Sequence, residues 1–127
     1  MGKRILIVDD EPNIVVSLEF LMRREGFEVE VAGDGQAALE AVEQRTPDLV
    51  LLDIMLPTIS GFDVCTRLRG DPRFRGLKIV MLTAKGREAD QARGTALGAD
   101  LYVTKPFSTK DLVAHVRQLL AAPVSSA

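Results

Sequence analysis

The stretch LVLLDIM, residues 49–55, decides how the rest of the chain is interpreted. Four consecutive apolar residues lead directly to the carboxylate of Asp53. An apolar run of this length is typical of a strand buried on both faces, as in the middle of a parallel sheet. Ligands of open parallel sheets bind outside the carboxyl ends of the strands, so Asp53 stands where a reactive group would be placed. Taken alone, such an acid is better explained as part of a turn or as a helix cap.

Composition describes an ordinary globular chain of one domain. It has 127 residues, of which 46% are hydrophobic and 27% charged. The net charge of −2 gives no basic surface, so we expect no direct nucleic-acid binding by this domain. No apolar run approaches the roughly 18–20 residues that span a bilayer, and a charged turn at Asp9 comes too early for a signal peptide. We therefore expect a cytoplasmic protein without membrane contact, whose single Cys65 forms no internal disulfide.

Strand-like and helix-like stretches alternate five times along the chain. The expected strands are residues 4–9, 27–32, 49–53, 77–82 and 101–103, and the expected helices begin near Pro12, Asp34, Ser60, residue 86 and Ser108. This alternation predicts a doubly wound α/β fold with helices on both faces of a five-stranded parallel sheet. Acids alternate with valines over 27–32, which indicates an edge strand. We expect one domain over residues 1–121 and a flexible tail or the start of a linker over 122–127.

Polar residues follow four of these expected strands. The first strand ends in Asp9, Asp10 and Glu11, the third in Asp53, the fourth in Thr83 and the fifth in Lys105. Each alone could be a solvated turn, a cap or a surface charge. Because the carboxyl ends of neighbouring parallel strands meet at one edge, we expect these groups to converge.

The chemistry of these groups favours phosphoryl transfer. Crowded carboxylates repel one another and need a counter-charge. Oxygen ligands without His or Cys select a hard cation such as Mg²⁺. A remaining carboxylate can act as a nucleophile and form an aspartyl phosphate, while an ammonium and a hydroxyl stabilise the phosphoryl oxygens. Asp53, Lys105 and Thr83 supply those three parts.

Five short motifs carry this pattern in order. They are IVDDE (residues 7–11), LLDIMLP (51–57), MLTA (81–84), GAD (98–100) and KPF (105–107). With this order and spacing the chain resembles a receiver domain of two-component response regulators, of the chemotaxis-receiver type, over essentially residues 3–121. The resemblance implies a flavodoxin-like sheet with strand order 2-1-3-4-5. It also implies a regulatory phosphoacceptor domain that assists its own phosphorylation and dephosphorylation but is not an enzyme.

The resemblance further implies a role for each site residue. Asp53 would accept a phosphoryl group from the phosphohistidine of a sensor histidine kinase or a phosphotransfer protein. Asp10 and Asp53 would ligate Mg²⁺, which Mn²⁺ can replace. The Met55 backbone carbonyl would be a further ligand, and Asp9 would act through metal-bound water. Lys105 would pair with the phosphoryl oxygens and form a cis peptide with the following proline.

The same resemblance implies a conformational switch. Thr83 would bind the phosphoryl group in the active state, and Tyr102 would turn inward into the space that Thr83 leaves. The surface formed by the helix at 86–97, the strand at 101–103 and the last helix would change, and a downstream output domain or protein would respond to it. A few kcal/mol suffices to invert the populations of two such states.

Some positions depart from one branch of the family. Receivers joined to winged-helix DNA-binding domains often carry a second acid after Gly-Ala-Asp and an Arg in the last helix, which pair across a dimer. Leu101 and His115 occupy those positions here, so we do not expect that style of dimer, and the oligomeric state stays open. His115 is then expected on a solvated helix face, and Cys65 as a small buried hydrophobe.

Two residues border the path of the hydrolytic water in this family. They are Met55, two residues after Asp53, and Lys85, two residues after Thr83. Met55 has no polar group to orient water, so we predict a phosphoryl group that lasts minutes or longer.

Three other functions fit the sequence less well. A Mg²⁺-dependent phosphohydrolase with an Asp nucleophile usually has a second Asp where Met55 stands. A flavodoxin-like FMN binder needs a Ser, Thr and Gly-rich loop after the first strand, whereas Asp9 and Asp10 would repel the phosphate. A pseudo-receiver that binds without being phosphorylated would not need the full set of site residues.

Overall fold

The computed structural model describes residues 2–84, 88–105 and 107–121, and the account below concerns these residues. In chain order the elements are β1 (Arg4–Val8), α1 (Pro12–Arg24), β2 (Glu28–Ala32), α2 (Gly35–Gln44), β3 (Leu49–Asp53), α3 (Gly61–Arg69), the 3₁₀ helix η1 (Pro72–Phe74), β4 (Lys78–Ala84), α4 (Glu88–Ala96), β5 (Leu101–Lys105) and α5 (Thr109–Ala121). None of the helices within these ranges is long and apolar enough to cross a bilayer.

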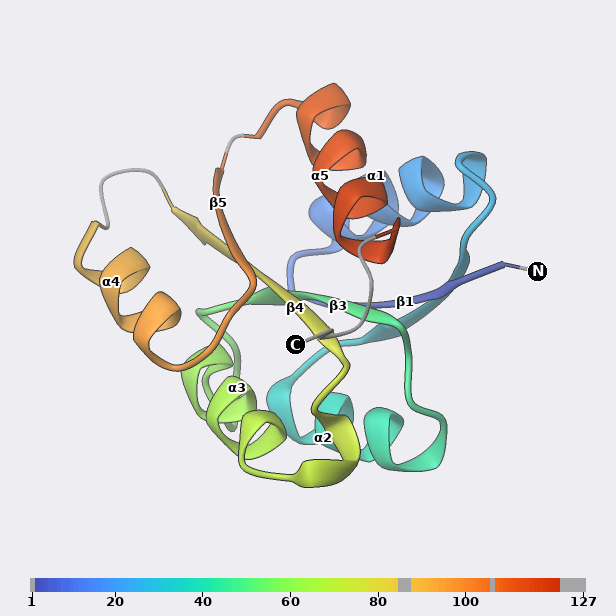
Figure 1. The fold of residues 1–127 in the computed structure, drawn as a ribbon. Helices are drawn as coiled ribbons and strands as arrows, with labels where there is room; N and C mark the ends of the chain where they lie inside the picture. Colours follow the sequence, from blue (N-terminus) through green and yellow to red (C-terminus); the bar gives the residue numbers. More distant parts are fainter. Residues whose placement is uncertain (1, 85–87, 106, 122–127) are drawn as a thin grey trace.

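The apolar run before Asp53 is the central strand of one parallel sheet. The strand order is β2-β1-β3-β4-β5, as predicted (Figure 1). Every residue of β3 is buried, including Asp53. All neighbouring strands pair in parallel, so their carboxyl ends lie at the same edge of the sheet.

Side chains alternate between two hydrophobic clusters on opposite faces of the sheet. In β3, Leu49 and Leu51 face the cluster under α1 and α5, whereas Val50 and Leu52 face the cluster under α2, α3 and α4. Figure 1 shows α1 and α5 above the sheet and α2 and α3 below it. Complete burial of each such side chain contributes about 1.5–3 kcal/mol, so the position of β3 is strongly determined.

Polar side chains fix where several helices begin. Pro12 is the first residue of α1. The backbone N–H at this position has no acceptor within the helix, so its absence in proline costs no hydrogen bond. In α2, α3 and α5 a capping oxygen accepts the backbone N–H three residues further on. The pairs are Asp34 with Ala37 (2.7 Å), Ser60 with Asp63 (3.2 Å) and Ser108 with Asp111 (3.2 Å). The helices α2, α3 and α5 therefore begin where the sequence predicted them to begin.

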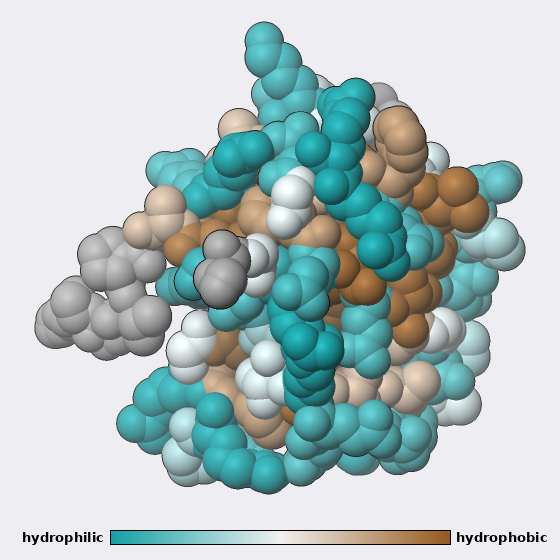
Figure 2. All heavy atoms as spheres, turned by 90° about the vertical axis from the view of Figure 1, so that its right-hand side faces the viewer, coloured by the Kyte–Doolittle hydropathy of each residue, from teal (hydrophilic) through white to brown (hydrophobic). Residues whose placement is uncertain are grey.

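β2 forms one edge of the sheet, as its alternating acids predicted. Glu28 is exposed, and Glu30 is bound to Arg4 at 2.9 Å. Three large hydrophobic side chains of α1 and β2 are exposed: Val16, Phe20 and Val31. Figure 2 shows hydrophobic surface among hydrophilic side chains on the side of the molecule where α1 ends.

Arg69, in the last turn of α3, joins three segments of the chain. Its guanidinium donates to the carbonyl oxygens of Leu77 (2.7 Å) and Gly98 (2.8 Å) and binds the Asp100 carboxylate (2.6 Å). The same Asp100 oxygen accepts the Ile79 N–H at 2.8 Å. The turn before β5 is thereby tied to α3 and to the start of β4.

The observed strand ends differ from the predicted ones by one or two residues in β1, β2, β4 and β5. β5 continues to Lys105 rather than ending at Val103, because Thr104 and Lys105 pair with Thr83 and Ala84 of β4. The connection after α3 contains η1, whose Phe74 is buried. The start of the predicted helix at 86–97 and the predicted tail at 122–127 fall partly or wholly outside the described residues.

Candidate functional site

Asp9 is a buried acid at the end of β1. Only 1% of it is exposed to solvent. One carboxylate oxygen accepts the Glu11 N–H at 2.9 Å, and the other lies 3.1 Å from the Lys105 ammonium. These two contacts fix its orientation. Asp10, the next residue, is exposed, so only the first of the two acids is held inside the protein.

Asp53 ends β3 and is 6% exposed. Its carboxylate lies 3.5 Å from the Lys105 ammonium and accepts a hydrogen bond from the Met55 N–H. Lys105 ends β5, two strands away from β3 in the sheet. Its long side chain therefore crosses the carboxyl end of β4 to reach both buried acids.

Three carboxylates form one compact cluster at this edge. Asp9, Asp10 and Asp53 each offer an oxygen, and these oxygens all lie within 4.8 Å of one another. Within the described ranges, the Lys105 ammonium forms ion pairs with two of these acids, Asp9 and Asp53. The cluster thus has excess negative charge and only oxygen donors, which fits a hard divalent cation such as Mg²⁺.

Burial and charge shift the pKa values of the central pair. Burial raises the pKa of the Asp53 carboxyl, and the negative charge of Asp9 raises it further, against the opposing effect of Lys105. Burial by itself would lower the pKa of the Lys105 ammonium. Its hydrogen bond to Asp9 and the charge of Asp53 outweigh this, so the pKa of Lys105 is raised and the ammonium stays charged. A bound cation would relieve the repulsion that Asp53 experiences.

Thr83 and Tyr102 belong to the other face of the sheet. Asp9, Asp53 and Lys105 continue the rows of side chains that face α1 and α5, whereas Thr83 continues the row of Met81 toward α3 and α4. Thr83 is buried, with 3% exposed. The predicted convergence therefore holds for the acids and the lysine, while Thr83 approaches the same edge from the opposite face.

Tyr102 packs on that second face beneath α4. It is partly buried against the cluster that contains Met81. A Cβ placed on Gly94 of α4 would lie 3.0 Å from two Tyr102 ring atoms and 3.0 Å from the Met81 sulfur. A side chain at position 94 would require its neighbours to shift by a few tenths of an ångström, so the Tyr102 ring and α4 are in close contact.

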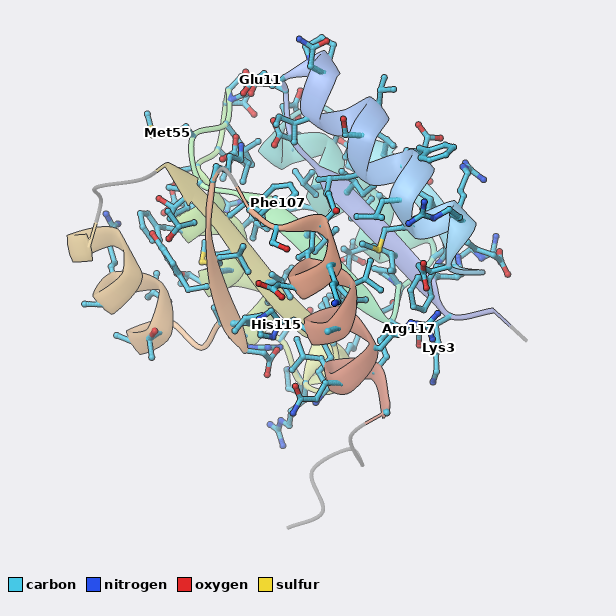
Figure 3. The ribbon with its side chains drawn as sticks, turned by 90° about the horizontal axis from the view of Figure 1, so that it is seen from above. Lys3, Glu11, Met55, Phe107, His115 and Arg117 are labelled. Atoms are coloured by element: carbon cyan, nitrogen blue, oxygen red, sulfur yellow. The ribbon has the colours of Figure 1, made fainter. Side chains whose placement is uncertain are left out.

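Met55 lies in the loop after β3 and is 62% exposed. Figure 3 shows Met55 and Glu11 at the same end of the molecule, on the segments that follow β3 and β1. Glu11 is exposed and contributes its backbone N–H to Asp9. Lys85 and Pro106, for which we predicted a water-path position and a cis peptide, lie outside the described residues.

Two glycines of this region were not recognised from the sequence as site residues. A Cβ on Gly61 would lie 2.2 Å from the Asp53 carbonyl oxygen, and one on Gly35 would lie 2.2 Å from the Ile59 carbonyl oxygen. The one signal in the sequence is their place directly after a capping residue, Ser60 or Asp34, at the start of a helix.

Two predictions about residues away from the acids concern Cys65 and His115. Cys65 is fully buried, and its sulfur lies 3.7 Å from the Leu97 carbonyl oxygen, as expected of a small core residue. His115 is exposed on α5 (Figure 3) and lines a hollow of about 280 Å³ with Leu101 and Phe107. The predicted solvated position of His115 is confirmed.

Comparison with known sequences points to one family. Residues 5–117 match the family model of the response regulator receiver domain. The DNA-binding response regulator MtrA of Mycolicibacterium smegmatis is 52% identical over 120 residues, which are 94% of this chain and 51% of that protein. The alkaline phosphatase synthesis transcriptional regulatory protein PhoP of Bacillus subtilis is 45% identical over 130 residues, 98% of this chain and 53% of PhoP. The chain thus spans about half the length of the curated relatives it matches.

Comparison with solved structures agrees with the sequence match. A putative response regulator from Chloroflexus aurantiacus has a TM-score of 0.93 and 37% identity, and the match covers 96% of this chain and 100% of that one. The receiver domain of the sensor histidine kinase PA1611 from Pseudomonas aeruginosa has a TM-score of 0.88 and 27% identity, with 96% and 100% covered. The latter structure has a magnesium ion coordinated in its active site cleft.

Proposed function

Because this chain belongs to the response regulator receiver domain family, we propose that it is a phosphorylation switch with Asp53 as the phosphoacceptor. Receiver domains of this family are regulatory parts of two-component systems. The observation that carries the proposal is the Asp53 carboxylate, 3.5 Å from the Lys105 ammonium and clustered with Asp9 and Asp10 at the sheet edge. We propose residues 1–121 as the receiver unit.

The proposed step is a phosphoryl transfer from phosphohistidine to carboxylate. An Asp53 oxygen attacks the phosphorus, an O–P bond forms, and the P–N bond to the donor imidazole breaks. The imidazole keeps the electron pair of that bond and, once protonated, leaves as neutral histidine. Little covalent work is required of the protein beyond placing the nucleophile and stabilising charge on the phosphoryl oxygens.

The acid cluster is the proposed holder of Mg²⁺, which Mn²⁺ can replace. Asp10, Asp53 and the Met55 carbonyl would ligate the ion, and Asp9 would act through metal-bound water. The bound ion would neutralise the carboxylates and the incoming phosphoryl oxygens. The excess of acids over lysine and the oxygen-only donors support this assignment.

Lys105 is proposed to stabilise the transferred group. Its ammonium already lies between Asp9 and Asp53, and its raised pKa keeps it charged at neutral pH. A phosphoryl group on Asp53 would carry up to about two negative charges in place of the single charge of the carboxylate. We expect Lys105 to pair with one of the new oxygens while Asp9 keeps its orientation through the Glu11 N–H.

The proposed readout is a change on the α4–β5–α5 surface. Thr83 would rotate to donate a hydrogen bond to the phosphoryl group, and Tyr102 would move into the vacated space. The contact of the Tyr102 ring with Gly94 supports a coupling to α4, because the ring cannot move without changing that contact. The proposed partners are a histidine kinase or phosphotransfer protein and a downstream output domain or protein. We propose that this exchange takes place in the cytoplasm.

Intact-mass measurement tests the proposal directly. The protein is incubated with MgCl₂ and a small phosphodonor such as acetyl phosphate. We expect a gain of one phosphoryl mass in wild type and in Asp63→Asn, an exposed acid of α3, and no gain in Asp53→Asn or after chelation of the metal. Absence of any gain in wild type would instead favour a binding module that is not phosphorylated.

A further inference from the structure

The loop that follows Asp53 rests on the first turn of α2. The Gly35 N–H donates to the Pro57 carbonyl oxygen at 3.5 Å. A Cβ placed on Gly35 would lie 2.2 Å from the Ile59 carbonyl oxygen and 2.7 Å from the Ile59 Cβ. Both distances are far below van der Waals contact. Any side chain at position 35 must therefore displace either the loop or α2.

The loop at residues 54–61 is a compact pair of linked turns. Its backbone hydrogen bonds run from Leu56 N–H and Gly61 N–H to the Ile54 carbonyl (3.1 and 2.9 Å) and from Ile59 N–H to the Pro57 carbonyl (2.8 Å). Met55 lies within the first turn. A displacement at Ile59 is therefore transmitted along the loop to the backbone of Met55.

Thr58 shows that contacts outside the loop help to hold its shape. Its φ of 66° is unusual for a β-branched residue, and such strain persists only where the surroundings enforce it. The two residues that flank Thr58, Pro57 and Ile59, are the two that contact Gly35. Gly35, in the first turn of α2, thus contacts the residues before and after the strained Thr58.

Of α2 and the 54–61 loop, α2 is the more firmly held. Asp34 caps its first turn through the Ala37 N–H at 2.7 Å, and Ala38 and Val42 are completely buried against the sheet. Gly35 is helical, so alanine suits its backbone conformation. When a methyl group is added at position 35, we therefore expect the loop to move.

We propose that Gly35 is a positioning residue for the Asp53 site. By lacking a side chain, it allows α2 to hold the 54–61 loop where the Met55 carbonyl can serve as a metal ligand. Gly35 acts only through the loop. This inference rests on the proposed function, since it concerns the metal that the phosphoacceptor site would bind.

The test compares Gly35→Ala with Gly33→Ala. A Cβ on Gly33 would meet nothing within 4 Å, so this control makes the same chemical change two residues away without a clash. The Kd for Mg²⁺ is measured from amide shifts in NMR titrations, and phosphorylation by acetyl phosphate is followed by mass at saturating Mg²⁺. We expect Gly35→Ala to weaken Mg²⁺ binding by roughly tenfold or more and to slow phosphorylation, whereas Gly33→Ala stays within about twofold of wild type.

Thermal unfolding without Mg²⁺ is measured alongside, because a merely structural role would lower stability alone. A folded Gly35→Ala protein with the wild-type Mg²⁺ Kd would overturn the inference. If Gly35→Ala does not fold, Asp34→Ala takes its place: it removes the cap of α2 at about 1 kcal/mol, while Asp34→Asn keeps an acceptor. Equal Mg²⁺ affinity of these two variants would likewise overturn the inference. A wild type that neither binds Mg²⁺ nor gains mass would contradict the proposed function itself, and the inference with it.

Discussion

Replacing Asp53 by asparagine is expected to stabilise the metal-free domain. Asparagine keeps the shape of the side chain but removes a charge that is buried beside two other acids. The raised pKa of Asp53 means that the folded state binds a proton there more tightly than the unfolded state does. Wild type therefore carries a penalty at neutral pH, and it gains stability as pH falls through the folded pKa of Asp53.

The distances give the size of the charge–charge interactions of Asp53. At an effective dielectric constant of about 20, two acids within 4.8 Å of Asp53 each repel it by about 3.5 kcal/mol. Lys105, at 3.5 Å, attracts it by about 4.7 kcal/mol on the same scale. Lys105 therefore offsets the repulsion by Asp9, and Asp10 is exposed and screened, so the main cost is burial of the charge, which is the largest cause of the raised pKa of Asp53. We expect Asp53→Asn to gain about 1 kcal/mol in stability.

Thermal and urea unfolding of wild type and Asp53→Asn measure this gain, with Asp63→Asn as a control for removing an acid elsewhere. For a domain of this size, about 1 kcal/mol corresponds to a melting temperature roughly 4 °C higher. The advantage of Asp53→Asn should shrink as pH falls and as MgCl₂ is added, because protonation or a bound cation neutralises the same buried charge. An Asp53→Asn protein that is no more stable than wild type at pH 7 without metal would refute the reasoning.

Three further predictions concern other residues. The phosphoryl group on Asp53 should last minutes or longer beside Met55, and its loss within seconds in Mg²⁺ without a phosphatase would contradict this. Arg69→Met should lower the free energy of unfolding by about 2–3 kcal/mol in a urea titration, because two carbonyls and a carboxylate lose their hydrogen-bond donor. Arg67→Met, on the exposed side of α3, should change the free energy of unfolding little in the same titration. Thr58→Gly should relieve the positive φ and leave the protein equally stable or up to about 1 kcal/mol more stable by thermal unfolding, and a clear loss would show that the loop is not strained there.

Much of the fold was readable from local patterns. A fully apolar run before Asp53 identified a central strand, and acids alternating with Val29 and Val31 identified an edge strand. Both patterns follow from burial: a strand buried on two faces is apolar throughout, whereas a strand with one solvent-exposed face alternates apolar and polar residues. The end of β5 was misjudged because Lys105 resembles a loop residue in sequence, whereas its strand conformation depends on pairing with β4. Such pairing joins residues far apart in the chain and has no local signal.

The site was predictable to a similar extent. The convergence of Asp9, Asp53 and Lys105 follows from their positions at the ends of parallel strands. The opposite orientation of Thr83 also follows from the alternation of side chains, but only once the extent of β4 is known. The close approach of Gly35 to the loop could not be derived, because it depends on how two helices and a loop pack together.

The two carboxylates of β2 affect whether another strand can be added at this edge of the sheet. The outer edge of this strand has unpaired backbone groups that another molecule could use to add a strand. In a symmetric antiparallel pairing centred on Glu30, this residue would face its own copy, and like charges directly opposite destabilise such pairs. Glu28 adds a second charge on the same face of the strand. We therefore expect the two acids to disfavour the addition of a further strand at this edge, and we expect this effect to be lost if both were replaced by apolar residues.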